Sequence, residues 1–124
     1  MRLEVNMVVS DAKAAGKYYE KLLKAEILSE TDYDLGMNEV MIKLGGFEVR
    51  VMDQNEKFGM FAPTKAGGGS MWLNIWVEDI EAYFEHVVNQ GVNVMSPVQE
   101  FPGPAKNAVF SDKFNHVWVI NQSY

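Results

Sequence analysis

LEVNMVVSDAKAAGKYYEKL, residues 3–22, returns in altered form as MWLNIWVEDIEAYFEHVVNQ, residues 71–90. The two stretches align with an offset of 68 residues. The same offset places VRVMDQ, residues 49–54, on VWVINQ, residues 117–122. Because one offset holds across two distant blocks, we interpret the chain as an internal duplication of a unit nearly half its length.

The composition is that of a folded domain of ordinary size. Of the 124 residues, 48% are hydrophobic, 23% are charged and none is cysteine, which excludes disulfides and thiolate metal sites. No apolar run approaches the ~18 residues of a membrane span, and no signal peptide precedes the first expected strand, so we expect a cytoplasmic protein. The net charge of −6, without a basic cluster, argues against nucleic acid and anionic membranes as partners.

Each half predicts a strand, a helix and three further strands. Alternating apolar residues predict strands, three- and four-residue spacing predicts helices, and Ser10-Asp11 and Glu78-Asp79 are typical helix starts. The first half is predicted to hold strands at 3–9, 25–30, 39–44 and 47–53, with a helix at 12–24. The second is predicted to hold strands at 71–77, 92–95, 106–111 and 116–121, a helix at 80–89 and a loop at 96–104.

The stretch 54–70 is expected to connect the units 1–53 and 71–124. Pro63 and the run Gly67-Gly68-Gly69 disfavour regular structure there. The stretch also contains Phe58, Met60 and Phe61. Two interpretations remain open for these apolar residues: they patch the edge of the core, or they belong to a flap that closes over a site.

The first strands of the two units predict a binding face. Their odd positions are apolar and are expected to pack on the helix of the same unit. The even positions hold Glu4 and Asn6 in one unit and Trp72, Asn74 and Trp76 in the other. Tryptophans are costly in open water, and asparagines and a glutamate are costly in a core. A half-enclosed cleft satisfies both conditions, so we expect these rows to line one.

The tandem βαβββ pattern, the VSD and VED junctions and the hairpin SDKFNHVWVI resemble the vicinal oxygen chelate superfamily, the glyoxalase, bleomycin-resistance and dioxygenase group. Asp112, Asn115 and His116 keep most of that family's hairpin signature, and the chain is closest to PhnB-like or bleomycin-resistance-like members. The resemblance covers essentially all of residues 1–124. It implies a single α+β domain whose two tandem βαβββ units form a curved mixed sheet around a cleft, with the helices outside, and it implies a homodimer.

The resemblance also implies positions for a divalent metal. They fall on Glu4 in the first strand, Trp72 in its counterpart, Val119 in the last strand and, by the offset of 68, Val51. Only Glu4 carries an oxygen or nitrogen donor, whereas a divalent ion needs several. We therefore expect no metal cofactor, with a divalent metal as the alternative.

Several side-chain roles stay open at the level of sequence. Glu4 is either a surface residue or a carboxylate of the site that accepts a hydrogen bond or acts as the catalytic general base. Trp72 and Trp76 either stack on a ligand or fill a collapsed cleft. Asn6 and Asn74 either orient a ligand or bond each other.

Three further residues lie on or beside the last strands. Trp118 is expected in the core and His116 in a structural role. Strand parity places Arg50 on the helix side, where it would pair with Glu48, reach a dimer partner or bind an acidic ligand.

The function that we expect is metal-independent binding of a small molecule, possibly aromatic, by Glu4, Asn6, Val51, Trp72, Asn74, Trp76 and Val119. The first alternative is a metal-dependent lyase, isomerase or dioxygenase that uses Glu4. The second is a structural dimer whose cleft is filled by its own side chains. A fold alone does not choose among them.

Overall fold

A computed structural model describes residues 1–65, 70–102 and 105–123. The chain divides into two compact units, Met1–Ala62 and Pro63–Tyr124. Within the described residues, no helix is long and apolar enough to cross a membrane.

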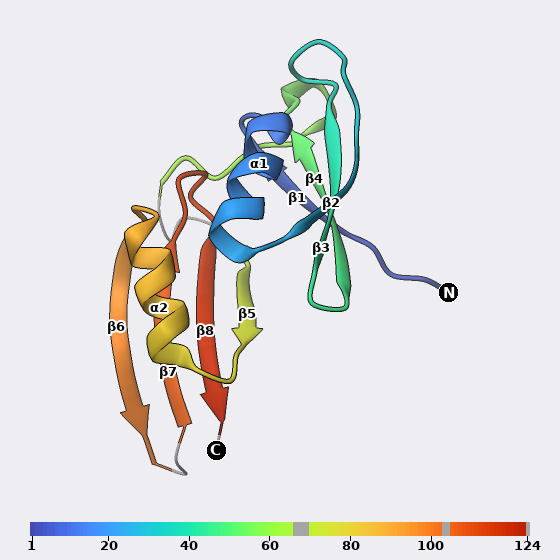
Figure 1. Ribbon diagram of the computed structural model, residues 1–124. Helices are drawn as coiled ribbons and strands as arrows, with labels where there is room; N and C mark the ends of the chain where they lie inside the picture. The colour runs from blue at the N-terminus through green and yellow to red at the C-terminus, as the bar shows by residue number, and fades with distance from the viewer. Residues whose placement is uncertain (66–69, 103–104, 124) are drawn as a thin grey trace. The chain divides into compact units, whose positions relative to one another are not determined.

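Unit 1 is a four-stranded mixed sheet with one long helix (Figure 1). Its strands lie in the order β1-β4-β3-β2; β1 and β4 are parallel, and the other two pairs are antiparallel. A short 3-10 helix follows the sheet. The elements are β1 (Val5–Val9), α1 (Ala12–Leu23), β2 (Glu26–Glu30), β3 (Glu39–Leu44), β4 (Phe47–Asp53) and η1 (Glu56–Phe58).

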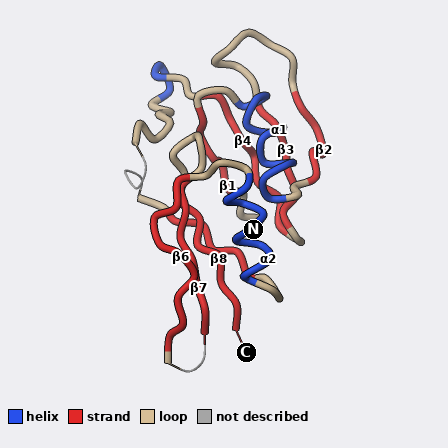
Figure 2. The backbone as a smooth tube through the Cα atoms, turned by 60° about the vertical axis from the view of Figure 1, so that its left-hand side comes forward, coloured by secondary structure: helices blue, strands red, loops and turns tan. Residues whose placement is uncertain are grey.

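Unit 2 repeats this plan. Its strand order β5-β8-β7-β6 matches that of unit 1 position by position, and β5 and β8 form the parallel pair. Figure 2 shows the antiparallel run of β6, β7 and β8 beside α2. The elements are β5 (Trp72–Trp76), α2 (Ile80–Asn89), β6 (Asn93–Phe101), β7 (Ala105–Ser111) and β8 (Val117–Ser123). The predicted α+β class with tandem βαβββ units is confirmed.

In each unit the helix covers one face of its sheet. In unit 1, Gly16 brings α1 so close to β3 that an added Cβ would lie 2.9 Å from Cγ1 of Val40. In the strand register Val40 pairs with Val51 and Val51 pairs with Met7. These three buried side chains therefore form one row across the sheet. In unit 2, Ile80 of α2 is fully buried, as are the core residues of the sheet Phe110 and Ile120. These are the apolar alternate positions that the strand pattern predicts.

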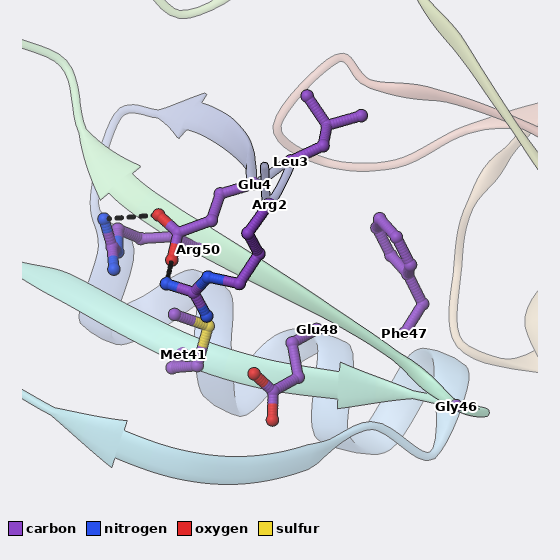
Figure 3. Close-up of a pocket in the computed structure, with 8 residues that line it drawn as sticks. All are labelled: Arg2, Leu3, Glu4, Met41, Gly46, Phe47, Glu48 and Arg50. Carbon is purple, nitrogen blue, oxygen red and sulfur yellow. Dashed lines mark hydrogen bonds and ion pairs between the residues drawn. The ribbon is translucent and has the colours of Figure 1, made fainter.

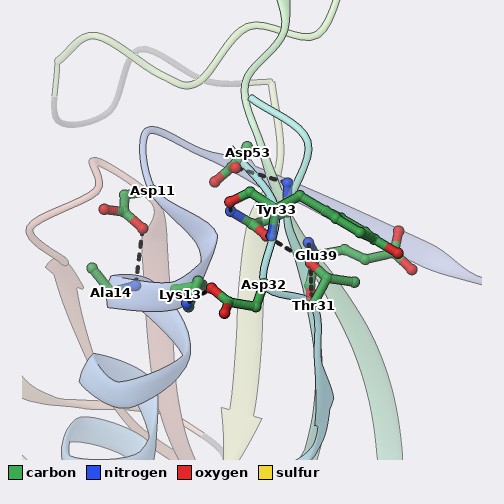
Figure 4. Close-up of polar contacts among 9 residues, drawn as sticks. Asp11, Lys13, Ala14, Thr31, Asp32, Tyr33, Glu39 and Asp53 are labelled. Atoms are coloured by element: carbon green, nitrogen blue, oxygen red, sulfur yellow. Dashed lines mark hydrogen bonds and ion pairs between the residues drawn. The ribbon is translucent and has the colours of Figure 1, made fainter. Parts of the chain in front are cut away.

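The two helices begin in the same way. Asp11 caps α1 by accepting from the amide of Ala14, and Asp79 caps α2 by accepting from that of Ala82, both at 3.1 Å. Around the start of α1, Lys13 also pairs with Asp32 at 2.6 Å (Figure 4). This pair raises the pKa of Lys13 and lowers that of Asp32, mainly through their shared hydrogen bond.

A side chain at the end of each last strand accepts from the first residue of the helix. Asp53 Oδ1 accepts from the amide of Ala12 at 2.6 Å, and Gln122 Oε1 accepts from that of Ile80 at 2.7 Å. Ala12 and Ile80 are 68 residues apart, whereas Asp53 and Gln122 are 69 apart. The single offset expected from the sequence is therefore wrong in the last strands, where unit 2 is one residue longer.

Two local expectations also change. Strand β6 continues to Phe101, although we expected a loop at 96–104. Pro97 is tolerated because β6 is an edge strand and its register with β7 is irregular between Ser96 and Gln99, where Pro97 has no paired partner. The connector contains η1, and its Phe58 and Phe61 side chains are 74% and 63% exposed. The glycine run at 67–69, where we expected no regular structure, lies outside the described residues.

Candidate functional site

The face of the unit 1 sheet that α1 leaves uncovered carries charged and polar side chains. On it, the register pairs Asn6 of β1 with Arg50 of β4, and Arg50 with Met41 of β3. Arg50 therefore lies opposite the helix, and the parity that placed it on the helix side is wrong. Val51 lies on the covered face and is fully buried. The position equivalent to Val119 is Arg50, because the last strands differ by the extra residue.

Glu4 lies between two guanidinium groups on this open face (Figure 3). Its Oε1 accepts from Nη2 of Arg2 at 2.5 Å, and its Oε2 is 3.3 Å from Nη1 of Arg50. Nε of Arg50 is 3.8 Å from Glu39 Oε1. Arg50 thus pairs with Glu4 and Glu39. Glu48, one of the three alternatives considered for Arg50, is not among its ion-pair partners in the described residues.

A hollow of about 240 Å³ opens beside this cluster. Its charged lining includes Glu48 and Arg50, and its apolar lining comes from Leu3, Met41 and Phe47 (Figure 3). Sequence reasoning did not select Met41 or Phe47. The register of β3 with β4, which places Met41 beside Arg50, was the signal that could have identified Met41.

The corresponding face of unit 2 carries the tryptophan row. The side chains of Trp72 and Trp76 are 53% and 65% exposed, with Asn74 between them on β5. The register pairs Asn74 with Val119 and Trp76 with Asn121. Strand parity therefore predicted this row correctly, and Val119 lies on it.

Asn74 is held by its own unit. Its Oδ1 accepts from Nδ2 of Asn121 at 3.0 Å, and the same Nδ2 lies 3.3 Å from the carbonyl oxygens of Ile75 and Val119. Asn74 therefore has a partner that the sequence analysis did not consider. This bond holds the Asn74 amide between Trp72 and Trp76 on β5.

The hairpin before β8 is organised by a buried carboxylate. Asp112 accepts from the amides of Phe114 and His116 through Oδ1 and from the indole Nε1 of Trp118 through Oδ2, the last at 2.8 Å. Trp118 is 3% exposed, which confirms its predicted place in the core. This part of the family-like motif builds the turn.

The residues at the expected metal positions do not fit a metal. Glu4 carries a donor but is paired with arginines, while Arg50, Trp72 and Val119 offer no suitable donor. In the described ranges, no three His, Cys, Asp or Glu side chains form a group that could hold an ion. The side-chain chemistry of these positions therefore disagrees with the metal that the resemblance implies.

Comparison with known proteins identifies relatives along the whole chain. The sequence model of the Glyoxalase/Bleomycin resistance protein/Dioxygenase superfamily matches residues 3–120. An uncharacterized protein of Mycobacterium bovis is 26% identical, with the match covering 97% of this chain and 82% of the relative. An uncharacterized protein of Mycobacterium tuberculosis H37Rv is also 26% identical, over 97% of this chain and 73% of the relative.

Solved structures show the same fold. TioX from Micromonospora sp. ML1 has a TM-score of 0.73 at 18% identity and covers 100% of this chain and 97% of its own. The fosfomycin resistance protein FosX from Listeria monocytogenes, complexed with Mn(II) and sulfate, has a TM-score of 0.77 at 13% identity, with coverages of 100% and 90%. A glyoxalase-related enzyme from Fulvimarina pelagi has a TM-score of 0.73 at 15% identity, with coverages of 99% and 89%.

Proposed function

Because the chain belongs to the glyoxalase/bleomycin resistance protein/dioxygenase superfamily, we propose that it is a small-molecule binding protein that works without a catalytic metal. Its ligand is a flat, aromatic molecule that stacks on Trp72 and Trp76. The observation that carries this proposal is the exposure of both indoles on the open face of one edge strand.

The chemistry of the row suits a flat ligand. Two indoles at alternate positions of a strand provide a large apolar area with few rotatable bonds, and aromatic pairs gain about 0.5–1.5 kcal/mol beyond burial. Val119, which pairs with Asn74 in the register, is only 8% exposed and supports the row from β8. The amide pair of Asn74 and Asn121 supplies polar groups that orient the ligand. Covering exposed indoles with a ligand removes apolar area from water, which favours binding.

The donor chemistry of unit 1 supports a metal-independent mode. At the position where a second metal-coordinating residue was expected, Arg50 presents a guanidinium beside Glu4. A bound divalent ion at Glu4 would be repelled by this fixed positive charge. We therefore assign no chemical step to a metal.

Tryptophan fluorescence tests the binding. We would titrate the protein with nicotinamide, quinoline and 4-nitrophenol, and we expect saturable quenching by at least one of these planar probes. Trp72→Ala should weaken that binding at least tenfold, because it removes one stacking surface. Lys65→Ala, an exposed change outside the row, is the matched control and should leave the affinity unchanged. Quenching that stays linear with probe concentration in both the unmodified protein and Trp72→Ala would contradict the proposal.

A metal-dependent enzyme is the second candidate. It is favoured by the likeness to FosX, which has been solved with Mn(II), and to a glyoxalase-related enzyme. Metal analysis of the purified protein separates the two. Near-stoichiometric Zn, Ni, Fe or Mn that is lost in Glu4→Ala would support the enzyme, whereas metal far below one ion per chain in both proteins supports the binding protein.

Within the superfamily, we propose the bleomycin-resistance-like type, acting in the cytoplasm as a homodimer. The hairpin residues Asp112, Asn115 and His116 support the type, and the resemblance to the superfamily supports the homodimer. Light scattering after size exclusion should give twice the 14.0 kDa chain mass. A mass of one chain at micromolar concentration would contradict the dimer and leave the binding proposal intact.

A further inference from the structure

Arg50 in the hollow of unit 1 has hydrogen-bonding capacity that its neighbours leave unused. Its side chain is 29% exposed, and its ion-pair distances of 3.3 and 3.8 Å exceed the about 2.7–2.9 Å of a strong charged hydrogen bond. Nε is buried and has no hydrogen-bond partner in the structure. An unpaired buried N–H is costly, so a ligand oxygen that reached this guanidinium would be favoured.

Glu48 provides an opposite charge at the same hollow. It lies on the same face of β4, two residues before Arg50, which separates their Cα atoms by about 6.6 Å. Lys43 lies opposite it in the strand register, but Glu48 forms no ion pair within the described ranges. The hollow therefore presents an unpaired carboxylate a short distance from an underused guanidinium.

The remaining wall is apolar. Leu3, Met41 and Phe47 line the hollow, and Phe47 is 53% exposed at its edge (Figure 3). An exposed aromatic ring beside a carboxylate attracts both an apolar group and an ammonium group. The volume of about 240 Å³ lies below the roughly 300–1,000 Å³ of pockets for drug-sized ligands, so the hollow suits a smaller molecule.

The charges decide which class of ligand fits. A simple anion would be attracted by Arg2 and Arg50, which both line the hollow. It would be repelled by Glu4, Glu39 and Glu48. A simple cation would pair with Glu48 but would leave Arg50 Nε unpaired. A zwitterion that carries both charges a few ångströms apart satisfies both groups at once.

We propose that the hollow of unit 1 binds a free amino acid with an apolar side chain. The carboxylate of the amino acid accepts from Arg50, its ammonium group donates to Glu48, and its side chain packs on Phe47 and Met41. This site is formed by residues of unit 1 alone, and it does not rest on the tryptophan row of the proposed function.

Isothermal titration calorimetry of the full chain tests the charge requirement. The probes are L-phenylalanine, L-leucine and L-methionine, with two analogues of phenylalanine that each lack one charge. Phenethylamine lacks the carboxylate, and 3-phenylpropanoate lacks the ammonium. We expect at least one of the three amino acids to bind and each analogue to bind at least tenfold more weakly than phenylalanine or not at all.

Two substitutions locate the site. Glu48→Gln, at an exposed position where folding should be unaffected, should weaken binding at least tenfold, and Arg50→Gln should do the same. Glu20→Gln, an exposed change on α1 at the other face of the sheet, is the matched control. Backbone amide shifts on addition of the amino acid should be largest at Gly46 and Phe47.

Three results would each overturn the inference. The first is no heat and no amide shift with any of the three amino acids at 10 mM, roughly the weak limit for a specific site. The second is equal binding of phenylalanine and phenethylamine, and the third is unchanged affinity in Glu48→Gln. Tryptophan quenching by the planar probes is a separate readout, so either proposal can fail while the other stands.

Discussion

Asp53 and Gln122 perform the same task in the two units, although they are not at matching positions of the sequence repeat. Each accepts from the first amide of its helix, at 2.6 and 2.7 Å. This bond satisfies an amide that has no partner inside the helix. The bond ties the end of the last strand to the start of the helix in each unit.

Asp53 should contribute more to stability than Gln122. Asp53 is 2% exposed, and its Oδ2 also accepts from the amides of Gly36 and Asn38 at 2.9 Å. Asp53→Ala leaves three amides without this acceptor and should lower the free energy of unfolding by about 2–4 kcal/mol, whereas Gln122→Ala should cost about 1 kcal/mol. Urea denaturation measures both. The control is Asp34→Ala, an exposed position in the loop between β2 and β3 that also contains Gly36 and Asn38. It should change the free energy of unfolding by less than about 0.5 kcal/mol.

Gly16 is required by the close approach of α1 to β3. An alanine there would place its Cβ 2.9 Å from Val40 Cγ1, and Val40 is fully buried. Gly16→Ala should therefore destabilise by about 1–2 kcal/mol, despite the better helix propensity of alanine. Val40→Ala removes the obstructing methyl groups. In a double-mutant cycle, we expect a favourable coupling of about 1 kcal/mol; strictly additive effects would show that this contact is not what limits residue 16.

Trp118 stabilises the hairpin through its indole N–H. Trp118→Phe leaves Asp112 Oδ2 without the bond of 2.8 Å inside a buried site, so it should cost about 2–3 kcal/mol from the lost bond and the lost packing. Thermal or urea unfolding measures this cost. Trp76→Phe changes an indole that is 65% exposed and should cost less than about 0.5 kcal/mol. Equal costs for the two changes would contradict the role given to Asp112.

Tyr83 should make stability fall at alkaline pH. Burial raises the pKa of its half-buried hydroxyl above the ordinary value of about 10. The unfolded chain therefore loses this proton at a lower pH than the folded chain. The stabilisation is complete below pH of about 10 and is lost as the pH rises through the folded pKa. Tyr83→Phe should flatten the decline in unfolding free energy above pH 9.5, while Tyr33→Phe, at a 67% exposed position, should not.

Much of this architecture could be predicted from alternation and repetition. The parity of β1 and β5 separates buried Met7 from exposed Trp72 and Trp76 correctly, because a strand with one covered face leaves little freedom. The last strands could not be aligned in the same way. VRVMDQ and VWVINQ share residues at an offset of 68, and these identities conceal the extra residue in unit 2. A shift of one residue reverses the face, and for this reason Val51 was expected where Arg50 lies.

The pairing of Arg50 was beyond the reach of the sequence for a second reason. Glu4, Glu39 and Glu48 all lie near it on the open face, and which two are its partners depends on side-chain geometry. The placement of Asp53 and Gln122 could have been inferred, since each helix start needs an acceptor and both residues end a strand.

Binding of a planar probe to protein treated with EDTA tests the central claim most directly. We predict that quinoline, or whichever of the three planar probes quenches saturably, binds with the same affinity before and after chelation, and that Trp72→Ala weakens this binding at least tenfold. Binding that disappears on chelation and returns with Mn(II) or Zn(II) would contradict a metal-independent binding protein.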